Sequence, residues 1–347
     1  MPHILESQSA LSTWLAGQQA PAFRATQIQR WLFQSRAAAF ADMSDLPQSL
    51  RDSAAAEFDI WTTTTALHQK SKDGTEKLLL RLSDGKAVEC VLLRDAARRT
   101  ICISSQVGCA MGCVFCASGL DGVDRNLTTG EIIEQMLVLQ RLLPEDERLS
   151  HIVVMGMGEP LANLDNLLPA LDIATSKDGL GISARRITIS TVGLPPGIHQ
   201  LAELNTRFQL AVSLHAPNDE LRNELVPVNK NIGIEAILAA ADHYFDVSSR
   251  RLTFEYVLLD QINDQIVHAR QLVRILQHRN ALLNVIPYNQ VAGLPYKRPS
   301  QNSIMQFRDI LEAGNINVQF RQLKGNEIDA ACGQLRRKSV EIQQIGD

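Results

Sequence analysis

The feature that most restricts the fold is a regular alternation of strand-like and helix-like segments from about residue 100 to residue 321. Short apolar runs are each followed by a longer stretch with helical spacing. Parallel neighbours in a sheet need a crossover, and a helix usually provides it. The pattern therefore predicts an α/β fold, a partial or full TIM-like (βα) barrel. The expected strands are 100–104, 151–155, 186–190, 209–214, 252–258, 282–287 and 317–321. The expected helices are 129–142, 164–176, 195–204, 233–245, 264–279 and 300–313.

The region before this alternation divides into two parts. Residues 1–60 have helical spacing interrupted by Pro21 and Ser44-Asp45-Leu46-Pro47, which predicts a small helical accessory domain of three helices. Residues 61–94 alternate with period two, and Asp73-Gly74 and Asp84-Gly85 are strong hairpin turns, so a β-hairpin extension is expected. The barrel core would then cover 95–323, and a C-terminal loop and tail 324–347.

Polar residues follow most of the predicted barrel strands, where the chemistry of such barrels lies. Glu159 could accept the ammonium group of an amino acid, and neutral side chains could bind a carboxylate or a ribose. Their accumulation on five strands indicates a small-molecule site. The residues at these strand ends are Cys109, Cys113, Cys116, Gly158, Glu159, Ser190, Ser213, Leu214, His215 and Asn289.

Three of the six cysteines stand in one short C-x3-C-x2-C stretch, Cys109, Cys113 and Cys116. Thiolates this close on one loop indicate a soft metal centre, and three ligands leave one coordination position open. The competing interpretation is a structural zinc site with Cys102 as the fourth ligand, although only Cys113 and Cys116 have the usual knuckle spacing. Clustered cysteines do not resemble a disulfide framework and favour a reducing compartment, so a cytoplasmic protein is expected.

Three further residues carry weaker signals. Cys332 lies between Gly325 and Gly333 in a loop-like segment, where its thiolate could be an exposed nucleophile or the thiol could simply be buried. Cys102 is expected on the same strand that leads to Cys109. Glu89 alternates with apolar neighbours, and taken alone this favours a solvated strand face over a catalytic role.

The formal net charge of −4 gives no overall field that would attract nucleic acid. Any such contact must come from local basic pairs. Neither a signal peptide nor an 18-residue apolar stretch is found, so no membrane segment is expected. The candidate phosphate contacts are Arg98-Arg99, Arg185-Arg186, Arg250-Arg251 and Arg336-Arg337-Lys338.

The combined motifs resemble the RlmN/Cfr family of radical S-adenosylmethionine (SAM) methyltransferases, which modify adenine in RNA. The resemblance covers nearly the whole chain. It rests on the segments 102–119, Arg125-Asn126-Leu127-Thr128, 156–161 and 328–335.

The resemblance implies a role for each candidate residue. Cys109, Cys113 and Cys116 would hold a [4Fe–4S] cluster, and the strand-end residues from Gly158 to Asn289 would bind SAM. Cys332 would accept a methyl group from a first SAM, and reductive cleavage of a second SAM would activate it for addition to adenine. Cys102 would then release the product by forming a transient disulfide, with Glu89 as proton acceptor. A monomer served by an electron donor such as flavodoxin or ferredoxin is expected.

Three functions remain open at the level of sequence. The leading one is methylation of C2 of an adenine in 23S rRNA, with tRNA as a further candidate substrate. The second is the Cfr-type reaction at C8 of the same base, which gives antibiotic resistance. Arg125-Asn126-Leu127-Thr128 favours C2, whereas the segments 115–119 and 324–327 match neither subgroup neatly. The third is a non-catalytic RNA-binding protein with structural zinc.

Overall fold

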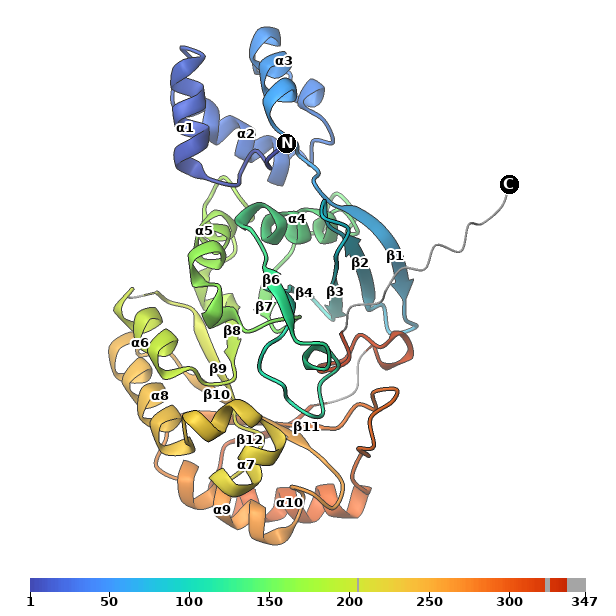
Figure 1. The fold of residues 1–347 in the computed structure, drawn as a ribbon, viewed down its shortest axis with the longest axis vertical. Coiled ribbons are helices and arrows are strands. Elements are labelled where there is room, and N and C mark those ends of the chain that lie inside the picture. The colour runs from blue at the N-terminus through green and yellow to red at the C-terminus, as the bar shows by residue number, and fades with distance from the viewer. Residues whose placement is uncertain (205, 322–324, 336–347) are drawn as a thin grey trace, which may run out of the picture.

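The computed structural model describes residues 1–204, 206–321 and 325–335. Seven parallel strands form most of one sheet, in the order β4-β7-β8-β9-β10-β11-β12 (Figure 1). In this sheet β1 and β12 are the two edges, so the barrel is partial rather than closed. This confirms the α/β prediction. The strands are β4 (Arg98–Cys102), β7 (His151–Val154), β8 (Ile187–Thr191), β9 (Gln209–Ser213), β10 (Leu252–Leu258), β11 (Ala281–Pro287) and β12 (Val318–Phe320).

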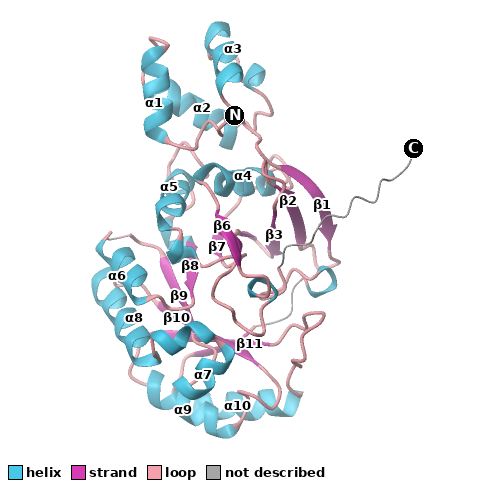
Figure 2. Cartoon of the chain, in the orientation of Figure 1, coloured by secondary structure: helices cyan, strands magenta, loops and turns pink. Residues whose placement is uncertain are grey.

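Crossover helices cover the outer side of this sheet (Figure 2). Six of them coincide with the predicted helices: α4 (Thr129–Gln140), α5 (Leu164–Thr175), α6 (Pro195–Glu203), α8 (Ile234–Ser248), α9 (Ile266–Leu276) and α10 (Gln301–Ala313). One short helix was not predicted, α7 (Asp219–Leu225), which starts at an Asn218 cap. None of the described helices is long and apolar enough to cross a membrane.

The N-terminal part forms three helices, as predicted, and stands at one end of the molecule (Figure 1). They are α1 (Gln8–Gly17), α2 (Phe23–Phe33) and α3 (Gln48–Glu57). Polar contacts attach them to the barrel: Glu6 accepts hydrogen bonds from the Thr128 hydroxyl and the Gly130 amide at the start of α4, at 2.8 and 2.9 Å. The Gln140 side chain donates to the Phe33 carbonyl at 2.8 Å.

Residues 61–94 extend the barrel sheet with antiparallel strands β1 (Thr64–Lys70), β2 (Glu76–Arg81) and β3 (Ala87–Asp95). Gly74 and Gly85 both have φ of +82°, a conformation that glycine adopts without strain in these two turns. Strand β3 pairs with β4, so the extension continues the main sheet. Glu89 is only 1% exposed, and the expectation of a solvated strand face was wrong because the C-terminal segment covers that face. The domain boundaries at 60, 94 and 323 stay predictions.

A small hairpin leads into and out of the cysteine stretch. It pairs β5 (Gln106–Gly108) with β6 (Val123–Asn126) and is separate from the large sheet. Cys102 ends β4, so the expectation that it shares a strand with Cys109 was wrong. Arg125 holds this hairpin by a bidentate pair with Glu131, at 2.7 and 2.8 Å. Thr128 caps α4, which gives this sequence motif a structural role.

Candidate active site

Two cavities meet at Cys332, near the carboxyl ends of the barrel strands. The cysteine-loop cavity is lined by Cys109, Cys113 and Cys116 and encloses about 820 Å³ of space, part of it open to solvent. The Cys102 cavity is lined by Cys102 and Asn289 and encloses about 670 Å³ by the same measure. Only Met155, Ile286 and Cys332 line both cavities among the described residues. Cys332 lies far from Cys109, Cys113 and Cys116 along the chain, and the fold brings it to the junction of the two cavities.

The three clustered cysteines line the cysteine-loop cavity together, and each is partly exposed. Burial raises the pKa of Cys109 to about 11, and it raises the pKa values of Cys113 and Cys116 as well. Thiols with raised pKa values lose their protons at neutral pH only when a positively charged metal centre stabilises the thiolates. Across the described residues, no three His, Cys, Asp or Glu side chains converge closely enough to hold one metal ion. A four-iron cluster fits this arrangement because each thiolate binds a different iron.

The position of Cys102 excludes the zinc interpretation. Cys102 lies on β4 and lines the other cavity, so it does not complete a four-cysteine site with the loop cysteines. Its side chain is buried, and burial raises the pKa of its thiol to about 12. At neutral pH the Cys102 thiol is therefore protonated.

Glu159 is the buried carboxylate of the cysteine-loop cavity. Its oxygens accept hydrogen bonds from the Val192 and Leu161 amides at 2.8 and 3.0 Å. Burial nevertheless raises its pKa to about 7, because these donors offset only part of the desolvation cost. An ammonium group in the cavity would supply the missing positive charge, as the sequence predicts.

The glycines before Glu159 serve the packing of the protein as well as the cavity. A Cβ at Gly156 would lie 2.6 Å from the Ser104 hydroxyl, and one at Gly158 would lie 2.7 Å from the Gln106 amide. Gly158 also has φ of +103°. A side chain at either position would therefore collide with the chain itself, so both glycines are required by the packing.

The other predicted binding residues divide between three places. Ser190, Ser213 and His215 line the cysteine-loop cavity. The His215 Nδ1 accepts the Val257 amide at 3.1 Å, and burial lowers its pKa to about 3, so the ring is neutral. Leu214 is fully buried in the core, so any contact with a ligand must come from its backbone. Asn289 lines the Cys102 cavity instead.

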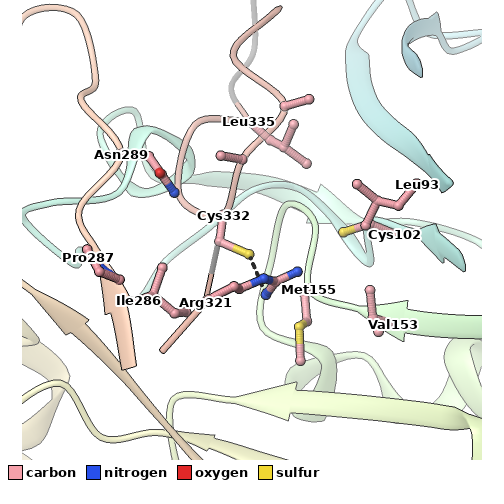
Figure 3. Close-up of a pocket in the computed structure, with 12 residues that line it drawn as sticks. Leu93, Cys102, Val153, Met155, Ile286, Pro287, Asn289, Arg321, Cys332 and Leu335 are labelled. Carbon is pink, nitrogen blue, oxygen red and sulfur yellow. Dashed lines mark hydrogen bonds between the residues drawn. The ribbon is translucent and has the colours of Figure 1, made fainter. Parts of the chain in front are cut away.

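Figure 3 shows Arg321 between Cys102 and Cys332. The sequence analysis did not predict this residue. Its Nη1 donates to the Cys332 Sγ at 3.2 Å. The neighbouring Cys332 sulfur raises the pKa of Arg321, so the guanidinium stays charged despite its burial. It can therefore stabilise negative charge on that sulfur. Its position at the end of the last predicted strand was the available signal.

Two other buried charges were also missed. Glu255 lines the cysteine-loop cavity, accepts from the Asn284 side chain at 2.7 Å, and has its pKa raised by burial to about 7. A carboxylate inside the apolar run 252–258 was its signal. Arg222 is fully buried in α7 and donates to the Leu214 carbonyl at 2.9 Å. Burial lowers its pKa to about 10, which leaves it charged near Cys113.

Comparison with known proteins decides the family. Residues 103–273 match the model of the Radical SAM superfamily, and residues 6–60 match the Ribosomal RNA large subunit methyltransferase N-terminal domain. A Rhodopirellula baltica protein named "Probable dual-specificity RNA methyltransferase RlmN" is 66% identical and covers 98% of this chain and 92% of its own. The chain belongs to the RlmN family of radical SAM methyltransferases. A Geobacillus kaustophilus relative with the same name is 45% identical over 94% of this chain and 90% of its own.

A solved structure agrees with this assignment. A radical SAM methyltransferase from Sphaerobacter thermophilus superposes with a TM-score of 0.93 and 41% identity, covering 97% of this chain and 99% of the other. Membership makes the chain a SAM-dependent enzyme with a [4Fe–4S] cluster. The cavities fit both groups: besides Glu159 and the cysteine loop, the Asn289 Oδ1 is buried with no hydrogen-bond partner among the described residues.

Proposed function

We propose that this RlmN-family enzyme methylates C2 of an adenine in 23S rRNA, with tRNA as a second substrate. The curated relatives that it matches over almost its full length are named dual-specificity RNA methyltransferases. The observation that carries the proposal is the position of Cys332, which lines the cysteine-loop cavity on one side and the Cys102 cavity on the other. A methyl carrier between a SAM site and an RNA base needs this placement.

In this proposal Cys109, Cys113 and Cys116 would hold the cluster in the cysteine-loop cavity, and the cluster would supply the electron for reductive cleavage of SAM. Glu159 binds the SAM ammonium group, and Ser190, Ser213, the backbone at Leu214 and His215 contact the rest of the molecule. Asn289 lines the adjoining Cys102 cavity and contacts SAM where the two cavities meet. Cys332 accepts the methyl group on Sγ, and Arg321 stabilises the sulfur anion that attacks the methyl carbon.

The Cys102 cavity receives the target base, which must leave its stack to reach the sulfur. Its walls are mostly apolar, with Leu93, Val153 and Met155 on one side. Glu89 takes the proton from the ring carbon, and the unpaired electron of the adduct would return to the cluster. The Cys102 thiol then gives up its proton as its Sγ attacks the Cys332 Sγ and a disulfide forms. The bond between the Cys332 Sγ and the methylene carbon breaks, and the electron pair left on that carbon takes up a proton to complete the methyl group.

The candidate RNA contacts are not equivalent. Arg98, Arg185, Arg186 and Arg251 are exposed, and we retain them as phosphate contacts. Arg99 instead forms a bidentate ion pair with Glu147, at 2.5 and 3.0 Å. The Glu147 carboxylate therefore already balances the charge of Arg99. Arg336, Arg337 and Lys338 lie outside the described residues, as does Lys324.

Nucleoside analysis tests the reaction directly. Ribosomal RNA from a host that lacks this methylation is incubated with the cluster-loaded enzyme, SAM and a reductant, then digested and examined by mass spectrometry. We expect 2-methyladenosine, and Cys332→Ala should give none. The Cfr-type alternative predicts 8-methyladenosine in its place, and that product alone would refute the C2 proposal.

The cellular setting is proposed with the reaction. A flavodoxin or ferredoxin would deliver the electron to a monomeric enzyme in the cytoplasm. Sedimentation of the loaded protein would test the monomer, and the RNA assay with purified flavodoxin in place of a chemical reductant would test the donor. No turnover with reduced flavodoxin, and none with reduced ferredoxin in the same assay, would exclude this donor class.

A further inference from the structure

Strands β2 and β3 bury an ion pair that the reaction scheme leaves unexplained. The Lys77 Nζ lies 2.9 Å from the Glu89 Oε1, and the two side chains are 2% and 1% exposed. Desolvating two charges costs about as much free energy as their attraction returns, so such pairs are often no more stabilising than apolar residues. A requirement other than stability is therefore the better explanation for a lysine at this position.

The strand register places this pair on the same side of the sheet as Cys102. Lys77 is opposite Val91, and Val91 is in turn opposite Cys102 on β4. Side chains alternate between faces along a strand, so Glu89 shares the face of Val91. Lys77, Glu89 and Cys102 thus project from one face of the extension, although they come from three different strands.

Lys77 also contacts the segment that carries Cys332. Its Nζ donates to the Asp329 carbonyl at 3.1 Å. The Gly325 amide donates to Asp73 at 2.8 Å, which fastens the start of the same segment to the turn before β2. In Figure 1 this red segment lies against the end of the extension. One ammonium group therefore joins the Glu89 carboxylate to the Cys332 segment.

We propose that Lys77 is a positioning residue for proton transfer: it pairs with the Glu89 carboxylate and fixes that carboxylate relative to the Cys332 segment. The inference rests on the proposed role of Glu89 as proton acceptor. When the ring carbon of the adduct loses its proton, the proton passes to the carboxylate and the electron pair of the C–H bond stays in the ring. Lys77 keeps its own proton and its bond to the Asp329 carbonyl.

Without the charge on Lys77, the Glu89 carboxylate would be buried without the cation that it pairs with at 2.9 Å. A carboxyl group this deeply buried favours its neutral form unless a positive charge lies beside it. Among the described residues, the other titratable groups that this alternation places on the same face are Arg81, Asp95, Arg98 and Cys102. The segment packed against the face adds Glu327, Asp329 and Cys332, with Arg321 beside Cys332. Lys77 is the cation that pairs with Glu89 at 2.9 Å, whereas the Arg321 guanidinium donates to the Cys332 sulfur.

Two steps of the reaction can be measured separately to test this. Methyl transfer to Cys332 is followed by the intact mass of the cluster-loaded protein, and RNA methylation by nucleoside analysis, from about pH 6.5 to pH 9. Lys77→Gln keeps a donor for the Asp329 carbonyl but removes the charge. Lys77→Arg keeps the charge. Lys70→Met, at an exposed lysine on β1, is the matched control.

We expect Lys77→Gln to methylate Cys332 like the wild type but to lose about tenfold or more of RNA methylation at pH 7. The loss should shrink as pH rises, because the carboxyl then ionises without help. Lys77→Arg and Lys70→Met should stay close to the wild type. The inference would be overturned if Lys77→Gln methylated RNA at the wild-type level at pH 7. It would also be overturned if the loss of RNA methylation in Lys77→Gln were equal at every pH.

Glu89→Gln separates this inference from the proposed function. Full RNA methylation by Glu89→Gln would refute Glu89 as proton acceptor, whatever Lys77 does. An inactive Glu89→Gln together with a fully active Lys77→Gln would refute the role of Lys77 alone. If Lys77→Gln does not fold, the double variant Lys77→Met/Glu89→Gln replaces the ion pair with two neutral side chains. Lys77→Arg is then the deciding variant. A loss of RNA methylation that is the same at every pH in folded Lys77→Arg counts against the inference.

Discussion

The affinity for SAM should depend on pH through one carboxylate, Glu159. It is 2% exposed and its pKa is raised by burial to about 7. If its carboxylate binds the SAM ammonium group, a proton on Glu159 competes with the ligand. For an acid with a raised pKa, the charged form is fully present above that pKa and is lost as pH falls through it. Binding should therefore be strong above pH 7 and weaken below it.

The size of the effect follows from the ionised fraction. With a pKa of about 7, Glu159 is about half ionised at pH 7 and about one-eleventh ionised at pH 6. The Kd for SAM should thus rise about fivefold between these two values, provided that binding requires the carboxylate. The α-amino group of the ligand, with a pKa near 7.7–8.0, stays protonated over this range.

Calorimetric titration of SAM into anaerobic, cluster-loaded, unreduced protein measures this slope. Glu255 lines the same cavity and has a similarly raised pKa, so Glu255→Gln is the matched control and should keep the slope. Glu159→Gln should bind SAM about tenfold or more weakly and show no slope. A flat wild-type profile, or a slope that persists in Glu159→Gln, would refute the assignment of Glu159.

Three other variants test the thiol side of the site and the fold around it. Cys332→Ala should bind SAM with unchanged affinity by the same calorimetry, whereas a large loss would mean that Cys332 helps to form the SAM site itself. Arg321→Met should slow alkylation of Cys332 by iodoacetamide about tenfold at pH 7, with a smaller effect for Arg321→Lys, and equal rates by peptide mass spectrometry would argue against the sulfur contact. Arg222→Met should lower the free energy of unfolding by about 3 kcal/mol, because Arg222 donates to the Leu214, Val192 and Ser213 carbonyls and to Asn229. A loss below about 1 kcal/mol in urea unfolding would contradict that estimate.

Local patterns predicted the sheet well because each barrel strand is a short apolar run bounded by polar residues. The 252–258 prediction coincides with β10 as observed. Helix α7 was missed because it is seven residues long, too short for a periodic pattern to emerge. The hairpin β5–β6 was missed for a related reason: β5 has three residues and pairs across the whole cysteine stretch.

The candidate site was predicted unevenly. Cys109, Cys113 and Cys116 were recognisable because their spacing is local. Glu89 was misjudged as solvated because alternation along a strand shows which residues share a face but not what covers that face. Arg321 and Lys77 escaped notice because a basic residue in a strand is usually solvated, and only a partner from elsewhere in the chain shows otherwise.

The sequence by itself determined the architecture, the family and the chemistry available, because these depend on local periodicity and on groups of residues close together in the chain. The tertiary structure decided how the thiols and charges are combined. It placed Cys332 where two cavities meet, set Arg321 against its sulfur, and joined Lys77 to both Glu89 and Asp329. These contacts connect residues as many as 252 positions apart. Such pairings depend on how the C-terminal segment packs against the sheet, which no local pattern specifies.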